Sequence, residues 1–371
     1  MNNKEKSRTR RYAGRVLISL VILFLLIAAG TAVLFREELK IMHSIERIMD
    51  EKPVYYMEVD GDYYFEEFLK SGGAASDKAV SAFLTKRISK GFYSVDVKES
   101  GLACSTISAN APEGSHVWGR NFDWTGSVPI IVRCVPKGGY ASISTCDFQN
   151  ITARPESISE GIPAAEKMVP EGIANKMLAI AALYVPMDGV NETGLCVADL
   201  EINEGGMITI DTEKPDLTIT TAIRLLLNKA ATVEEAIKLL KQYDIYASGG
   251  ISHHLAISDA AGASVSIEFV EGELVVADTN IVTNFNLANG NTAAGGENAK
   301  ERYNCLSGLY KEKEGSFTGE QVKEALAQVS QSEGKWTTQW SIVHEQASSS
   351  VTYYFDCNFE KPYRFGVWHL Y

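Results

Sequence analysis

Cysteine is the most reactive side chain in this 371-residue chain, and its positions limit the chemistry that the chain can perform. The sequence contains no CxxC pair and no Cys/His group with metal-ligand spacing, so we expect no metal and no cofactor. The spacing does not define a disulfide pattern. If one thiol is catalytic, at least one of the remaining five is free or pairs between chains. The six positions are Cys104, Cys134, Cys146, Cys196, Cys305 and Cys357.

Cys104 differs from the other cysteines because ordered polar motifs follow it. The segment CSTI begins at Cys104, and GRNFDW follows after the turn residues APEG, a pattern that predicts a hairpin. Three later blocks complete the order. They are DGVNETGL with Asn191, HLAISD followed by VTN with Asn284, and ERY with Arg302.

This ordered set resembles the choloylglycine hydrolase-like enzymes, which include bile salt hydrolases, penicillin V acylases and acid ceramidase-like amidases. Each block alone is weakly specific, but four in order over roughly residues 100–366 are considerably more so. The resemblance implies the N-terminal-nucleophile hydrolase fold, a four-layer αββα sandwich of the α+β class. It also implies that Cys104 is the nucleophile and that its own α-amino group is the base.

The resemblance assigns a role to each polar residue, and thiol chemistry explains why such roles are needed. A thiol with a pKa of ~8.5 and an α-amine with a pKa of ~7.7 are both mostly protonated at neutral pH. Nearby cations lower both pKa values and favour the thiolate, which is the role implied for Arg120 and Arg302. Asp123 would accept a hydrogen bond from the α-amine. Asn284 would donate its side-chain amide to the oxyanion of the tetrahedral intermediate.

Two further residues are candidates on the substrate and oxyanion side, Asn191 and Glu201. In bile salt hydrolases an asparagine aligns with Glu201, and its backbone N–H completes the oxyanion hole. A backbone donor survives the change to glutamate, but the carboxylate would add negative charge beside the pocket. This departure weakens the bile-salt assignment and leaves the hydrolase class intact. Bile salts, acylated amino acids, acyl lactones and penicillin V all remain open as substrates.

Each catalytic candidate also has a purely structural interpretation. Cysteine is among the most buried residue types, so Cys104 could be a core residue. Arg120 and Asp123 could form an ordinary ion pair across the hairpin. Asn284 could cap a turn, and Arg302 could lie on the surface of a helix.

The elements that position these residues form runs of strands and runs of helices, which predicts α+β layers rather than alternating βαβ units. One strand begins with His253 and His254, which we interpret as one buried and one exposed imidazole. The expected strands are CSTISAN, HVWGRNF, GLCVADLEI, HHLAISD, SVSIEFV, ELVVAD, WSIVHEQ, SVTYYFD and YRFGVW. The expected helices are KMLAIAALY, TAIRLLLNKA, TVEEAIKLLKQY and residues 318–329.

The chain divides into a basic tail (1–15), an apolar segment (16–35), a lead segment (36–103) that we expect to be helical, and a hydrolase domain (104–371). The apolar segment carries no charge, and its 20 residues at ~1.5 Å each would span about 30 Å, enough to cross a bilayer. A cleaved signal peptide is the alternative, but its apolar region is usually about 7–15 residues long. We favour an uncleaved signal anchor.

Charge then predicts the topology and excludes one class of partner. The basic residues before the apolar segment keep the N-terminus cytoplasmic and place residues 36–371 outside. The net charge of −12 and the acidic body argue against a nucleic-acid partner. The expected partners are the membrane and a small-molecule N-acyl amide, and a homo-oligomer is left open.

Three functions fit the sequence. The first is a membrane-anchored extracytoplasmic amidase that cleaves a linear N-acyl amide bond through a thioester on Cys104. The second is an acyltransferase that uses the same thioester, and the third is a tethered binding module with a retired site. The third is disfavoured because all five catalytic candidates are present together. A free α-amine on Cys104 requires cleavage of the Ala103–Cys104 bond, and the resemblance favours self-cleavage that leaves residues 36–103 packed as a helical cover.

Overall fold

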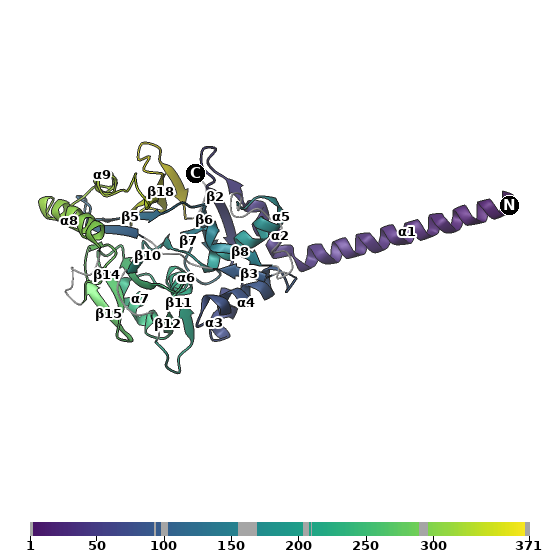
Figure 1. The fold of residues 1–371 in the computed structure, drawn as a ribbon, viewed down its shortest axis with the longest axis horizontal. Helices are drawn as coiled ribbons and strands as arrows, with labels where there is room; N and C mark the ends of the chain where they lie inside the picture. Colours follow the sequence, from purple (N-terminus) through teal and green to yellow (C-terminus); the bar gives the residue numbers. More distant parts are fainter. Residues whose placement is uncertain are drawn as a thin grey trace.

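Two β-sheets lie face to face in the body of the molecule, and helices cover their outer faces (Figure 1). The computed structural model describes residues 3–92, 94–97, 103–154, 169–202, 208, 210–288 and 296–367. The αββα arrangement predicted from the sequence is confirmed.

The larger sheet has nine strands within the described residues, in the order β1-β2-β6-β7-β9-β10-β13-β14-β15. Strands β2 and β6 run parallel, and the other neighbours are antiparallel. The bounds are β1 Glu46–Arg47, β2 Tyr55–Asp60, β6 Pro129–Val135, β7 Ser142–Asp147, β9 Asp188–Asn191, β10 Cys196–Ile202, β13 Ser252–Ser258, β14 Ser264–Val270 and β15 Glu273–Asp278.

The smaller sheet, counted over the same described residues, has six antiparallel strands in the order β16-β4-β5-β17-β18-β19. Strands β4 and β5 form the predicted hairpin, in which the Ala111 N–H donates to the Ser115 carbonyl. The bounds are β4 Ala103–Asn110, β5 His116–Trp124, β16 Ile281–Val282, β17 Thr337–Glu345, β18 Ser350–Phe355 and β19 Tyr363–Gly366.

Helices bury apolar faces on both sheets. Most lie on the outer face of the larger sheet, and two lie on the outer face of the smaller sheet. The first group is α2 Arg36–Ser44, α3 Phe65–Lys70, α4 Asp77–Ile88, α5 Gly172–Ala179, α6 Ile219–Lys229 and α7 Val233–Leu240. The second group is α8 Glu297–Glu312 and α9 Gly319–Gln328. Within the described residues, the body also contains two small two-stranded sheets and two 3₁₀ turns. The sheets pair β3 Ser94–Val97 with β8 Ile151–Arg154, and β11 Asp216–Thr218 with β12 Asp244–Tyr246. The 3₁₀ turns are η1 Phe148–Asn150 and η2 Ile180–Tyr184.

The space between the two sheets is a separate apolar core. Alternate residues of β5, such as Trp118 and Phe122, enter this core, whereas Val117 packs against α9. Leu200 of β10 reaches the same inter-sheet core from the other side. Cys104 belongs to this core, so its thiol lies between the sheets.

The lead segment is not purely helical, which corrects our expectation. Strand β2 lies between β1 and β6 inside the larger sheet. Tyr55, Met57 and Val59 face the helices, and Tyr56 faces the inter-sheet core, so both faces of β2 are buried. The run VYYMEV is rich in the aromatic and β-branched residues that favour strands, and Pro53 ends any helix before it.

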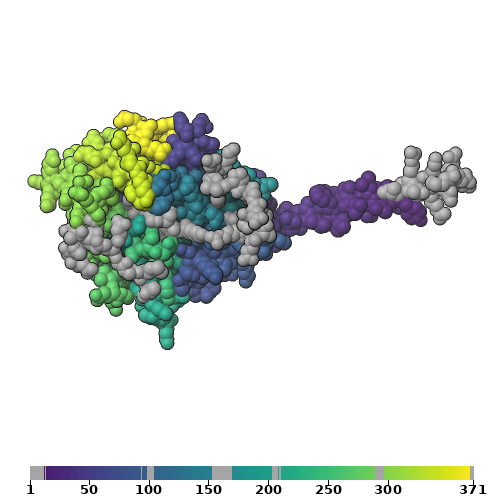
Figure 2. All heavy atoms as spheres, in the orientation of Figure 1, coloured from purple at the N-terminus to yellow at the C-terminus, as the bar shows by residue number. Residues whose placement is uncertain are grey.

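Helix α1 (Asn3–Leu34) projects from the body as a straight rod (Figures 1 and 2). Its segment Gly14–Leu34 has a mean hydropathy of 2.9 and is not buried against the body. The length and composition of this segment suit a membrane span.

Candidate active site

Strand β5 places Arg120 and Asp123 on opposite sides of the smaller sheet. Cys104 on β4 is paired with Phe122, so Arg120 faces the thiol between the sheets. Asp123 is an odd number of residues away from Arg120 and faces the helix layer. The two side chains therefore do not form the ion pair that we had considered.

Arg120 holds the thiol and is itself held by the larger sheet. Its Nη2 lies 3.3 Å from Cys104 Sγ and donates to the carbonyl of Asp199 at 3.0 Å. Its Nη1 donates to the Met187 carbonyl at 2.6 Å and to Asp188 Oδ2 at 2.5 Å. Arg120 and Asp188 are fully buried, and a buried guanidinium needs such a carboxylate as its counter-ion.

Asp188 was not assigned a role from the sequence, although it begins the DGVNETGL block. Its Oδ2 also accepts a hydrogen bond from Trp340 Nε1 at 2.8 Å. The carboxylate is therefore fixed from both sheets. The signal that could have identified it is the need of a buried arginine for a partner, but the partner lies 68 residues away in the chain.

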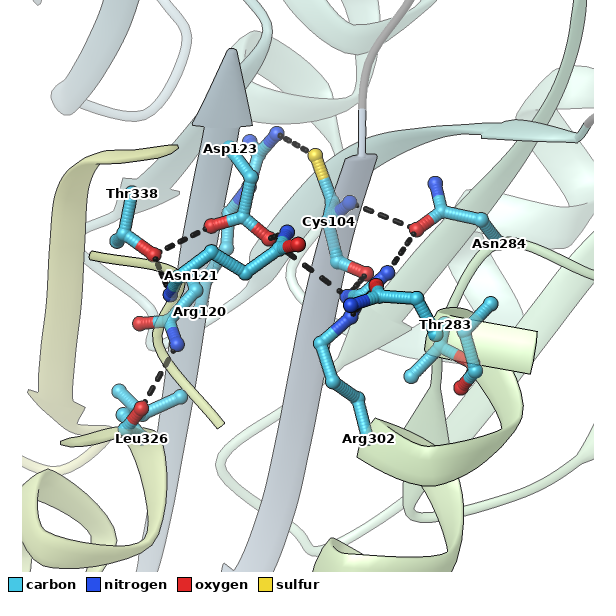
Figure 3. A network of polar contacts seen from close by, with 12 residues as sticks. Cys104, Arg120, Asn121, Asp123, Thr283, Asn284, Arg302, Leu326 and Thr338 are labelled. Carbon is cyan, nitrogen blue, oxygen red and sulfur yellow. Dashed lines mark hydrogen bonds and ion pairs between the residues drawn. The ribbon is translucent and has the colours of Figure 1, made fainter. Parts of the chain in front are cut away.

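On the helix side of β5, two residues hold the main chain of Cys104 (Figure 3). The Cys104 N–H donates to Asn284 Oδ1 at 2.8 Å, and the Cys104 carbonyl accepts from Arg302 Nη1 at 2.5 Å. Arg302 Nη2 also donates to Asn284 Oδ1 at 2.8 Å. Arg302 is only 5% exposed, so it is not the surface residue that we had considered.

These contacts determine how the Asn284 amide is oriented. Its oxygen accepts from two donors, so a flipped amide would place N–H groups against N–H groups. The nitrogen consequently faces the Glu201 carbonyl, to which it donates at 2.9 Å. The contact to the Cys104 nitrogen that we expected of Asp123 is made by Asn284 in the uncut chain.

Asp123 is fixed by residues that the sequence did not reveal. Its two carboxylate oxygens accept hydrogen bonds at 2.6 Å from Thr338 Oγ1 and Gln331 Nε2. Arg302 Nη1 lies 3.7 Å from Asp123 Oδ2. Thr338 is directly opposite Asp123 in the β5–β17 ladder, a pairing between segments more than 200 residues apart.

Burial keeps the Cys104 thiol protonated in the uncut chain. Loss of water raises the pKa of Cys104 to about 11, and Asp123 adds to the rise, whereas Arg120 opposes it. The thiol becomes a nucleophile only when it loses its proton. The Arg120 guanidinium is the cation in contact with Sγ and therefore favours the thiolate.

Asn191 is not brought to this site. Its Nδ2 donates to the carbonyls of Leu227 and Ala230, and its Oδ1 accepts from the Thr193 and Leu195 main chain. These contacts close the turn after β9 and dock it on α6. The structure thus gives Asn191 a turn-stabilising position in place of the substrate or oxyanion position that we expected.

Glu201 contributes its main-chain carbonyl to the site through Asn284. Strand alternation places its side chain on the face of β10 opposite Leu200, the face shared with Asp199. Its cross-strand partner is His253, and its charge helps to raise the pKa of that imidazole. This position differs from the expected one beside the pocket.

The two neighbouring histidines are both buried, which corrects the expectation of one exposed imidazole. His253 Nδ1 lies 3.0 Å from both carboxylate oxygens of Asp199, and His254 Nδ1 lies 3.3 Å from Ser266 Oγ. Strand β13 is covered by helices on one face and by the second sheet on the other, so both alternating directions are inside the protein.

A model of the linear amide C–N hydrolases, choloylglycine hydrolase family, matches residues 104–287. This match assigns residues 104–287 to the family. The chain is a hydrolase of linear amide C–N bonds, the class for which the family is named. The match begins at Cys104, the residue around which the polar contacts converge.

Solved structures of similar fold include two enzymes. A mutant conjugated bile acid hydrolase from Clostridium perfringens has 15% identity and a TM-score of 0.50, with 71% of this chain and 92% of that chain covered. A penicillin V acylase from Agrobacterium tumefaciens has 17% identity and a TM-score of 0.47, with 68% and 83% covered. At this identity the bile acid hydrolase supports the fold alone. No curated protein sequence matches the chain.

Proposed function

We propose that the chain is a membrane-anchored cysteine amidase that hydrolyses a linear N-acyl amide through a thioester on Cys104. One observation carries this proposal. The sulfur, nitrogen and carbonyl oxygen of Cys104 are each held by a polar partner, namely Arg120, Asn284 and Arg302. Any buried strand residue needs partners for its N–H and carbonyl, but a cysteine buried only for packing needs no buried guanidinium at its sulfur.

The proposed reaction uses these partners in order. The free α-amine of Cys104 takes the thiol proton, and Arg120 stabilises the resulting thiolate. The thiolate adds to the substrate carbonyl, and the oxyanion receives a hydrogen bond from the side-chain amide of Asn284. The C–N bond breaks, the amine leaves with the proton, and water hydrolyses the thioester to release the acid.

The proposal requires that the Ala103–Cys104 bond be cleaved first, because an amide nitrogen is not a useful base. In self-cleavage the Cys104 sulfur adds to the Ala103 carbonyl carbon, and the C–N bond breaks as the nitrogen gains a proton. Water then hydrolyses the thioester, which leaves a carboxylate on Ala103 and a free amine on Cys104. The start of the family match at Cys104 supports this site of cleavage.

The lead segment should stay bound after cleavage. Strand β2 pairs with β6 over six residues, and both of its faces are buried. Removal of β2 would expose these side chains and the unpaired edge of β6. We therefore propose that the lead is a permanent part of the sheet rather than a detachable cover.

Cys104→Ala tests the nucleophile, with Cys196→Ala as the control for loss of a buried thiol. The control is suitable because Cys196 is equally buried on β10, and its sulfur donates to the Gly194 carbonyl rather than contacting a charged group of the site. A panel of N-acyl compounds, with and without added amine acceptors, would reveal hydrolysis or acyl transfer. We expect Cys104→Ala to lose turnover while Cys196→Ala keeps it. Wild-type turnover by Cys104→Ala would refute the mechanism.

The proposed topology places the catalytic body outside the cell, with residues 1–15 in the cytoplasm. Protease added to intact cells should digest the body and spare the N-terminal tail. A body that is protected, with the protease shown to reach the membrane surface, would refute this orientation.

A further inference from the structure

Helix α1 enters the body without a flexible linker. The apolar segment ends at Leu34, and Glu38, only four residues later, is already buried. The Phe35 N–H donates to the Thr31 carbonyl, and the Leu39 N–H donates to the Phe35 carbonyl, so helical hydrogen bonds cross the junction. Four helical residues span about 6 Å, which is the greatest separation between the end of the span and the body.

That separation is no larger than the headgroup layer of a bilayer. The headgroup and interfacial region adds about 5–8 Å on each side of the hydrocarbon core. A body that begins within this distance cannot stand clear of the membrane. The surface around the exit of α1 must therefore lie within the headgroups, provided that α1 spans the bilayer as proposed above.

Two large apolar side chains are exposed at this end of the body. Phe92 is 79% exposed and Ile173 is 78% exposed, the highest values among large apolar residues of the described body. We propose that Phe92 and Ile173 insert into the lipid interface beside α1 and fix the orientation of the body on a phospholipid bilayer. This inference rests on the membrane anchor of the proposed function.

Phe92 is fixed beside the exit by the turn that ends α4. Its N–H donates to the Ser89 carbonyl, and Lys90 and Gly91 have the positive φ angles of 54° and 86° that this turn requires. Lys90 Nζ donates to Glu38 Oε1 at 2.6 Å and lies 5.5 Å from the centre of the Phe35 ring. The turn is thus attached to the first residues after the span.

Ile173 lies on the first turn of α5, which packs against α2 at the end of the body from which α1 leaves (Figure 1). Lys176, one turn later, donates through Nζ to the Ile45 carbonyl at 2.9 Å and to the Met42 carbonyl at 3.4 Å. These bonds tie α5 to the last turn of α2. The exposed face of α5 therefore has a fixed position relative to the membrane span.

Val276 provides a natural comparison. It is 37% exposed on β15, which lies at the end of the body opposite α1 (Figure 1). Val276 is thus an exposed apolar residue far from the exit of α1, where the proposal expects no contact with lipid. It therefore serves as the control position.

Tryptophan fluorescence of the full chain in phosphatidylcholine vesicles tests the proposal. The variants are Phe92→Trp and Ile173→Trp, with Val276→Trp as the control, because tryptophan suits the membrane interface. Each variant is compared with the unsubstituted chain in vesicles with and without bromine on the acyl chains, since bromine quenches nearby tryptophan. Flotation of the vesicles is measured first, to show that the chain is membrane-bound.

We expect brominated lipid to remove most of the emission added by Phe92→Trp and by Ile173→Trp, and to leave that of Val276→Trp unchanged. Quenching at either test position that is no greater than at Val276→Trp would overturn the docking of this face, even when the chain floats with the vesicles. A chain that does not float would overturn the membrane anchor itself, and this inference with it.

Discussion

The two faces of β5 act on different parts of Cys104. On the inter-sheet face, Arg120 contacts the sulfur and is paired with Asp188. On the helix face, Arg302 contacts the main-chain oxygen of Cys104 and Asn284 contacts its nitrogen. Asp123 forms an ion pair with Arg302 on the same face. The alternation of a strand thus separates control of the thiol from control of its backbone. Changes on one face should leave the function of the other largely intact.

The largest effect should follow from Arg120→Gln. A hydrogen bond to a charged group contributes about 1.5–3 kcal/mol, and the thiolate fraction should therefore fall by roughly 10–100-fold. The readout is the rate at which the uncut chain converts into two fragments, measured over a range of pH. In the unsubstituted chain this rate should rise about tenfold per pH unit below the thiol pKa of about 11. Loss of the cation raises that pKa, so the curve should move to higher pH.

Two controls separate the thiol effect from loss of a buried charge. Arg224→Gln removes another fully buried arginine, one that contacts Ser142 and Ser144 rather than the thiol. The double variant Arg120→Gln/Asp188→Asn avoids leaving the Asp188 carboxylate unpaired. An unchanged pH curve in both Arg120 variants would contradict the assigned role.

A smaller effect should follow from Arg302→Gln on the helix face. The Asn284 amide loses one of the two donors that orient it, so fragment formation should slow by about tenfold. The position of the pH curve should not change, because no contact between Arg302 and the sulfur is involved. A shift equal to that of Arg120→Gln would show that the two faces do not act separately.

The smallest effect on the chemistry should follow from Asp188→Asn. The carboxylate opposes the field of Arg120 at the sulfur, so its removal lowers the thiol pKa and moves the curve to lower pH. The shift should be less than about one pH unit, because the carboxylate acts through Arg120. Unfolding in denaturant should show a loss of about 3–5 kcal/mol, as expected when a buried ion pair loses one partner. A curve that moves to higher pH would contradict this account.

Sequence reasoning succeeded where local patterns determine structure. The β4–β5 hairpin follows from alternation and a turn. Thr232 caps the start of α7, and its side chain accepts from the Glu235 N–H as the capping motif predicts. The prediction that Arg120 and Arg302 both lie at Cys104 came from the family resemblance. The opposite orientation of Arg120 and Asp123 could have been read from their odd spacing on a strand.

The errors concern contacts between distant segments. Strand β2 pairs with a segment more than 70 residues later in the chain. We did not predict this strand, because the segments on either side of it have helical patterns. Asp188, Gln331 and Thr338 join the site only through sheet pairing and helix packing. Burial of both His253 and His254 depends on a second sheet, which a single strand does not reveal.

N-terminal sequencing of the active, natively purified enzyme tests the central claim most directly. The account predicts two fragments, Met1–Ala103 and Cys104–Tyr371, that co-purify because β2 remains within the sheet and separate only on denaturation. Cys104→Ala should remain a single uncut chain. An active preparation that is wholly uncut before Cys104 would contradict the role of the α-amine as the base.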